Sequence, residues 1–176
     1  MGATDSASCT ITGVIHALSR HDLQVPKYRE GDWFAVPLRD GGYAVGLVAR
    51  ANQKGVLLGY FFGPRRDEMP SLTDTQTLTP SQAILIGKFG HLGLKGGDWP
   101  ILGRQPGWDR EAWPMPVLIR YEELTGRTFQ VFYDPDDPLK LLRQEQVPPG
   151  AAEQGPKDSM MGAGFVEIRL TRLLSD

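Results

Sequence analysis

The sequence predicts a mainly β protein, built as a curved antiparallel sheet or a partly open small barrel with little helix. Residues 31–63 hold three apolar clusters, each the length of one strand, with a glycine-containing turn after the first and after the second. This is the pattern of a three-strand meander. The 176 residues include 21 glycines and 14 prolines, a content that favours many turns and few helices. The meander is therefore the element around which we expect the sheet to form.

The strands of the predicted meander are residues 33–38, 43–49 and 56–62. Asp40-Gly41-Gly42 provides residues that accept a positive φ, as a tight hairpin with the native twist requires. Residues 52–55 offer the same turn chemistry in a looser form.

The next two stretches are predicted as a strand and a loop. Residues 81–89 contain the apolar run 83–86, whose continuity predicts a strand buried on both faces. Residues 87–97 carry five glycines but no Gly-Lys-Ser/Thr signature of a phosphate loop. We therefore expect a flexible or tightly turning loop there.

Residues 98–116 hold three of the four tryptophans and four prolines, so we expect this segment to lie over the sheet with its indoles partly buried. Residues 117–121 and 128–133 predict a second hairpin, because they are rich in β-branched and aromatic residues and Gly126 permits the turn. An acidic turn at 134–138 follows it.

The C-terminal third is less regular. Residues 139–147 are consistent with another short strand, although their apolar positions do not alternate cleanly. Residues 165–174 narrowly favour a strand, because Val166, Ile168 and Leu170 alternate with polar residues. A helix remains the alternative, since Val166, Leu170 and Leu173 also share a helical face.

The domain organisation follows from length and composition. Residues 1–22 give no clear assignment, and residues 23–176 are predicted to form a single β-rich domain. No run reaches the roughly 18 apolar residues of a membrane span, and the N-terminus lacks the basic and apolar regions of a secretory signal. We therefore expect a cytoplasmic protein without a membrane partner.

The charge and the cysteine content of the chain argue against several classes of function and of binding site. The net charge of -2 lacks the basic excess that phosphate contacts need, so nucleic acid is an unfavoured partner. Cys9 is the single cysteine and forms no intrachain disulfide. The chain has no Gly-x-Ser-x-Gly, HExxH or CxxC motif, and Cys9 with His16 is the only thiol pairing. We predict no catalytic residue, no metal and no cofactor.

Two sets of residues are candidates for contact with a protein partner. The tryptophans either cap the core or provide an exposed aromatic anchor. The carboxylates lie in predicted turns, beside aromatic strand residues, where they could steer a basic partner. The candidates are Trp99, Trp108, Trp113, Glu122, Glu123, Asp134, Asp136 and Asp137.

Residues 31–51, GDWFAVPLRDGGYAVGLVARA, with the following LLGYFFG, resemble the opening of the immunity protein 26 family of bacterial polymorphic toxin systems. Members of that family begin with a Gly-Asp-aromatic-Phe-Ala-Val/Ile-Pro-Leu strand, a turn and a second strand that contains Tyr and Gly. The later GGDWPILGRQPGW, with the proline-rich stretch to Pro116, is similar to the Trp-Pro-Ile/Val-Leu/Ile-Gly segment of the family. Together these matches fall within residues 27–121.

The resemblance implies a non-enzymatic protein that binds and neutralises a cognate toxin domain. Immunity families are shuffled among toxin types, so it names no particular toxin, and no catalytic residue carries over. Two other hypotheses stay open. One is a small-barrel nucleic-acid-binding module, because three-strand meanders recur in such barrels. The other is a hydrolase that uses acidic residues, for which no motif nominates a substrate.

Overall fold

The computed structural model describes residues 28–148 and 155–175, which form two antiparallel sheets with few helices. The main sheet has six strands in the order β5-β1-β2-β3-β4-β9, and the smaller sheet has three in the order β6-β7-β8. Among the described strands, β4 and β9 are the one pair that runs in parallel. The strands are β1 (Asp32–Pro37), β2 (Tyr43–Ala51), β3 (Val56–Arg66), β4 (Leu85–Gly90), β5 (Ile101–Arg104), β6 (Leu118–Glu122), β7 (Arg127–Asp134), β8 (Asp137–Val147) and β9 (Met160–Met161).

Helices occupy three places around these sheets. Two short 3-10 helices, η1 (Leu72–Thr75) and η2 (Pro80–Gln82), lie between β3 and β4. The one-turn helix α1 (Leu92–Gly96) follows β4, and α2 (Ala163–Leu173) is the last element of the chain. The prediction of a mainly β fold with a curved sheet is therefore confirmed, and the described strands do not close into a barrel.

The predicted meander is present as β1, β2 and β3. Gly41 and Gly42 adopt φ values of 97° and 73°, and the amide of Leu38 donates to the carbonyl of Gly42 at 2.9 Å. In the second turn the side-chain oxygen of Asn52 accepts hydrogen bonds from the amides of Lys54 and Val56. Both turns thus use the side-chain and glycine chemistry expected from the sequence.

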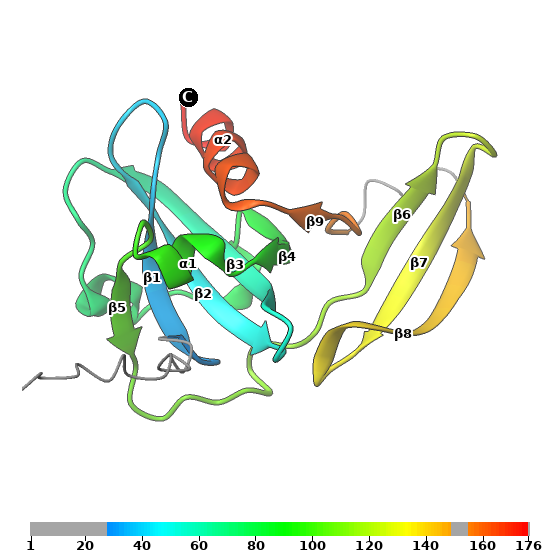
Figure 1. The fold of residues 1–176 in the computed structure, drawn as a ribbon, viewed down its shortest axis with the longest axis horizontal. Coiled ribbons are helices and arrows are strands. Elements are labelled where there is room, and N and C mark those ends of the chain that lie inside the picture. The colour runs from blue at the N-terminus through cyan, green and yellow to red at the C-terminus, as the bar shows by residue number, and fades with distance from the viewer. Residues whose placement is uncertain (1–27, 149–154, 176) are drawn as a thin grey trace, which may run out of the picture.

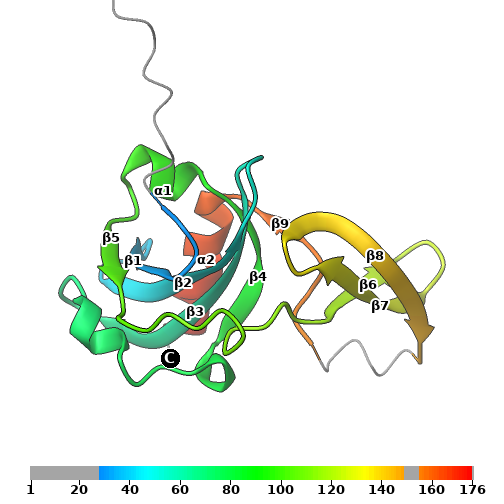
Figure 2. The same cartoon turned by 90° about the horizontal axis from the view of Figure 1, so that it is seen from below.

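The main sheet curves around α2, as Figures 1 and 2 show. Successive residues of β1 point to opposite faces, and both faces are covered. On the α2 side, Phe34 packs with Phe61, Phe89 and Trp99 in one apolar cluster that also includes Val166 of α2. The main sheet is therefore the central layer of the protein.

The other face of the main sheet carries a second apolar cluster. Trp33, Tyr60 and Phe62 pack there against Trp113. The segments that follow β3 and β5 cover this face, and the phenolic oxygen of Tyr60 donates to the carbonyl of Pro114 at 2.6 Å. Residues 105–116 lie over the sheet, as expected for the segment 98–116, but residues 101–104 do not, because they form the edge strand β5 of that sheet.

The narrow preference for a strand at residues 165–174 is wrong, because this segment lies in helix α2. Val166 and Leu170, one helical turn apart, are both fully buried against the sheet, whereas Ile168 is 39% exposed. The alternation of apolar residues was coincidental. Docking of the Val166 and Leu170 face on the curved sheet decides the structure, as tertiary packing does for most helices.

Two further expectations require correction. The run 83–86 is not buried on both faces: β4 begins only at Leu85, and Ile84 is 38% exposed. The reason is that β9 pairs with β4 only at Lys88 and Phe89, so the rest of this edge is not covered by a strand. Residues 87–97 are not a loop, because β4 continues to Gly90 and α1 follows.

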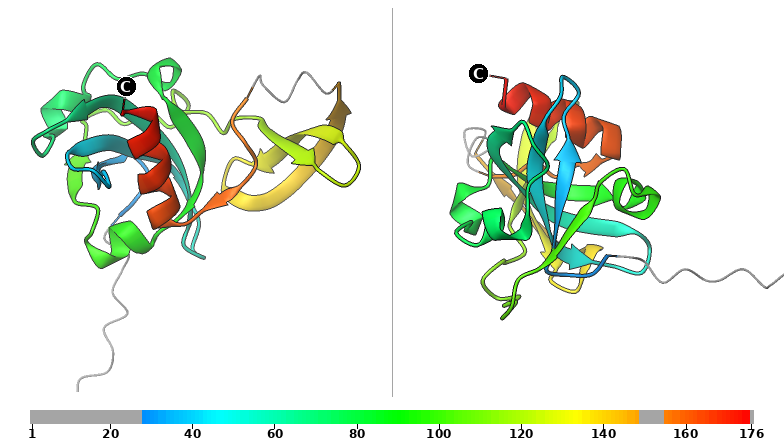
Figure 3. Two further views of the ribbon diagram at one scale, coloured as in Figure 1. Left: turned by 90° about the horizontal axis from the view of Figure 1, so that it is seen from above. Right: turned by 90° about the vertical axis from the view of Figure 1, so that its left-hand side faces the viewer.

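The smaller sheet stands beside the main sheet, and the left view of Figure 3 shows the separation from a further direction. The hairpin predicted at 117–121 and 128–133 is confirmed as β6 and β7, and β8 extends it with a strand of 11 residues. After β8 the chain returns along β6, where residue Lys157 forms a parallel bridge with Ile119, and then joins the main sheet as β9.

Candidate partner-binding site

A groove of about 950 Å³ lies between the two sheets, and we refer to it as the inter-sheet groove. One wall is formed by β4 and α2, and the other by β6 and residues 155–159. Its apolar lining includes Ile84, Ile86, Tyr121 and Phe165. Tyr121 is 57% exposed and Phe165 is 51% exposed, so the groove presents large apolar side chains to solvent.

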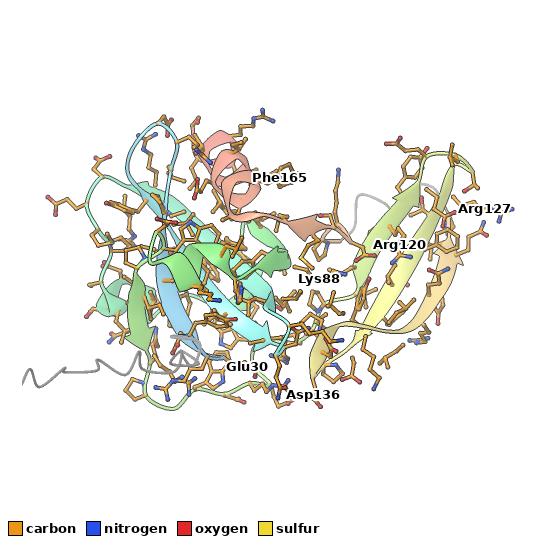
Figure 4. All side chains as sticks on the ribbon, in the orientation of Figure 1. Glu30, Lys88, Arg120, Arg127, Asp136 and Phe165 are labelled. Carbon is orange, nitrogen blue, oxygen red and sulfur yellow. The ribbon has the colours of Figure 1, made fainter. Side chains whose placement is uncertain are left out.

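An ionic cluster, formed by the buried side chains of Lys88 and Asp158 and the partly exposed side chain of Arg120, joins the two sheets beside this groove. Asp158 lies 2.8 Å from Nζ of Lys88 on β4 and 2.6 Å from a guanidinium nitrogen of Arg120 on β6. In Figure 4, Lys88 lies between the two sheets and Arg120 lies on the smaller sheet. The ammonium of Lys88 also lies 3.6 Å from the centre of the Tyr133 ring, a cation–π contact. The cluster thus connects β4, β6, β7 and the returning segment.

The pKa of the Asp158 carboxyl reflects this environment. Burial alone would raise it, but the hydrogen bonds and charges of Lys88 and Arg120 outweigh burial, so the pKa is lowered from its ordinary value of 3.8. The pKa of Arg120 is raised, chiefly by its hydrogen bond to Asp158. Both shifts favour the charged pair at neutral pH.

A second set of contacts joins the sheets at the β7–β8 turn. Arg110 binds Glu30 at 2.8 Å and Asp136 at 2.8 Å, and the side-chain amide of Asn52 donates to Asp137 at 2.8 Å. In Figure 4, Glu30 and Asp136 lie close together at this end of the molecule. Two of the predicted acidic contact residues therefore hold the smaller sheet against the main one.

The remaining predicted carboxylates lie at both ends of the smaller sheet. Asp134 pairs with Lys140 of β8 at 2.7 Å, close to the β7–β8 turn. Glu122 accepts a hydrogen bond from Thr125 in the opposite turn, and Glu123 beside it is exposed and lines the inter-sheet groove. The acidic residues thus form two separate groups instead of one surface.

The three predicted tryptophans differ in exposure. Trp99 is 1% exposed and Trp113 is 8% exposed, so both belong to the core clusters. Trp108 is half-buried, stacks on Trp113 at 6.4 Å and packs so closely on Gly31 that a Cβ there would lie 2.7 Å from its ring. Trp108 therefore has the most accessible indole of the three.

Sequence reasoning missed the residues that form the inter-sheet groove and its ionic cluster. The sequence around Lys88 could have indicated a buried ion pair, because a lone cation within the apolar stretch 83–89 needs a buried partner. No feature of the sequence around Asp158 indicates a buried carboxylate, since this residue follows a polar segment in which carboxylates are common. Phe165 and Arg169 could be found only once residues 165–174 were known to be helical.

Side chains that could ligate a metal do not gather in the part of the chain that the structure describes. No group of three His, Cys, Asp or Glu side chains within residues 28–148 and 155–175 could hold a metal ion. The ring of His91, the one histidine in these ranges, is hydrogen-bonded to the hydroxyl of Tyr28 at 2.8 Å. Among the described helices, none is long and apolar enough to cross a membrane.

Comparison with known proteins adds one finding. The model of the family described as Immunity protein 26 matches residues 29–130, more than half of the chain. The match extends from the residues before β1 into β7, so it includes the β4 and β6 walls of the groove but not α2. Neither the curated proteins nor the solved structures gave a match.

Proposed function

Because the chain belongs to the immunity protein 26 family, we propose that it binds a cognate toxin domain of a polymorphic toxin system and neutralises it without catalysis, in the cytoplasm. The family match over residues 29–130 is the observation that carries this proposal. The inter-sheet groove supports it, since exposed aromatic and aliphatic side chains gathered in one place are typical of surfaces that bind proteins.

The test is capture of the partner. The tagged protein, incubated with lysate of its source organism and washed with salt, should retain one protein in stoichiometric amount, identified by mass spectrometry as the terminal domain of a large secreted polypeptide. Co-expression should then abolish the toxicity of that domain. Retention of nucleic acid alone, lost as salt rises, would instead support the small-barrel nucleic-acid-binding module.

For the contact surface we retain the predicted residues as one hypothesis. Trp108 would be the anchor, stacked on the buried Trp113, and the carboxylates Glu122, Glu123, Asp134, Asp136 and Asp137 would steer a basic partner, with the buried Trp99 and Trp113 supporting the surface only as core residues. Trp108→Ala should then weaken binding of the captured toxin by at least about 2 kcal/mol, as loss of an interface hot spot does. Titration calorimetry measures this change.

The steering role has its own prediction. Joint replacement of Asp136 and Asp137 by lysine should lower the association rate about tenfold at low salt, because steering acts on encounter rates. Surface plasmon resonance reads the rate, and Asp67→Lys in the exposed loop after β3 serves as the control. An unchanged association rate in the double variant would leave these carboxylates with only their internal contacts to Asn52 and Arg110.

A further inference from the structure

The inter-sheet groove is lined mostly by residues outside the predicted contact set, of which only Glu123 lies in the groove. Its exposed apolar side chains come from three elements: Ile84 precedes β4, Tyr121 lies on β6 and Phe165 lies on α2. Their exposed fractions are 38%, 57% and 51%. Large apolar side chains that converge on one groove from separate elements form a contiguous patch, which is typical of a site of contact.

The groove is also positively charged within a chain whose net charge is -2. Four cations line or underlie it, Lys88, Arg120, Lys157 and Arg169, against the two carboxylates of Glu123 and Asp158. The difference is two positive charges. A positive groove in a negative protein is complementary to an anionic ligand.

Two of these cations are available to a ligand. Asp158 is shared by Lys88 and Arg120, so these three groups largely satisfy one another. Lys157 and Arg169 form no ion pair with any other described residue, and they stand on opposite walls of the groove. A ligand with carboxylates on both sides would meet one cation on each wall.

The backbone of the β6 wall points to an extended ligand. The amide of Ile119 donates to the carbonyl of Pro156 at 2.8 Å, and its carbonyl accepts from the amide of Asp158 at 2.7 Å. Because strand residues alternate in direction, the amide and carbonyl of Tyr121 face the same edge. There they meet no backbone partner among the described residues. An added strand can pair with this free edge.

From these observations we propose that the inter-sheet groove binds an extended acidic segment of the toxin, with apolar side chains alternating with Asp or Glu. Its backbone pairs with β6 at Tyr121, its apolar side chains contact Phe165, Ile84 and the Tyr121 ring, and its carboxylates face Lys157 and Arg169. The identification of the segment as part of a toxin rests on the proposed function. The chemistry of the segment rests on the groove.

The groove is tested directly with three fluorescein-labelled nine-residue peptides that alternate Leu or Phe with Glu, Lys or Gln. Fluorescence anisotropy should show the Glu peptide binding at least about tenfold more tightly than the Lys peptide, because reversing two facing charges replaces attraction by repulsion. The Gln peptide should lie between them. Equal binding of all three peptides, or no binding of any, would overturn the proposal.

Charge-swap variants locate the binding in the groove. Lys157→Glu combined with Arg169→Glu should weaken the Glu peptide about tenfold and strengthen the Lys peptide. Arg172→Glu is the matched control, because Arg172 is exposed on the same helix but does not line the groove. An equal loss in the control would overturn the assignment, as would a duplex DNA oligonucleotide that binds more tightly than the Glu peptide. Unchanged circular dichroism establishes that each variant is folded.

The same variants separate this inference from the proposed function. If the wild type and Arg172→Glu capture the toxin from lysate and the double variant does not, the immunity function and the groove as its contact site both stand. If all three capture it equally, the immunity function stands and the groove is not its contact site. If the Glu peptide binds in the groove but no toxin is captured, the peptide site stands and the proposed function fails.

Discussion

Replacement of Trp99 by alanine is expected to lower the free energy of unfolding by about 4 kcal/mol, the usual size of a buried Trp→Ala change. The indole is 1% exposed and lies parallel to the Phe34 ring at 5.6 Å. Its Nε1 also donates to Glu167 of α2 at 3.0 Å. The change would therefore leave a cavity between the sheet and α2 and remove a contact that positions the helix. Urea unfolding followed by circular dichroism measures the loss.

The control is Trp108→Ala, which removes the same side chain from a half-buried position. It should cost about 1 kcal/mol, because much of the lost surface was already in contact with water. A similar loss for both variants would show that Trp99 is no more important to the core than the surface indole.

Asp158→Asn is expected to destabilise the protein by about 3 kcal/mol at neutral pH, because it leaves the buried ammonium of Lys88 without its carboxylate. The side chains of Lys88 and Asp158 are only 7% and 4% exposed, so water cannot take the place of the lost charge. Hydrogen exchange should show the largest loss of protection in β6 and β7, whose tie to β4 passes through this cluster. Uniform loss across both sheets would contradict that local role.

The same cluster predicts a dependence on pH. The pKa of Asp158 is lowered in the folded protein from about 3.8 in the unfolded chain. Its stabilising contribution is therefore fully present above the unfolded value and is lost as pH falls through the folded value. The difference in unfolding free energy between wild type and Asp158→Asn should shrink in acid. Asp67→Asn is the control: Asp67 is exposed in the loop after β3 and takes part in none of the ion pairs among the described residues, so its loss should have little effect at any pH.

Local sequence patterns were sufficient for most of the sheet. The meander, the β6–β7 hairpin and both turns of the meander follow from residues adjacent in the chain, because period-two alternation and glycine conformations act over a few residues. Where two periodicities overlapped, as in residues 165–174, local pattern could not decide. The curved face of the sheet decided instead, since it offered Val166 and Leu170 a surface to bury.

For the candidate site, too, some features follow from the sequence and others only from the tertiary structure. The sequence by itself determined the fold class, the family resemblance and the aromatic and acidic residues that a binding surface could use. Only the tertiary structure decided which of them remain accessible: it buries Trp99 and Trp113 but leaves Asp136, although paired with Arg110, at the surface. It also brings Lys88, Arg120 and Asp158 together from segments about 30 to 70 residues apart. The physical reason is that contacts between distant segments depend on how whole sheets pack, which leaves no period in the sequence.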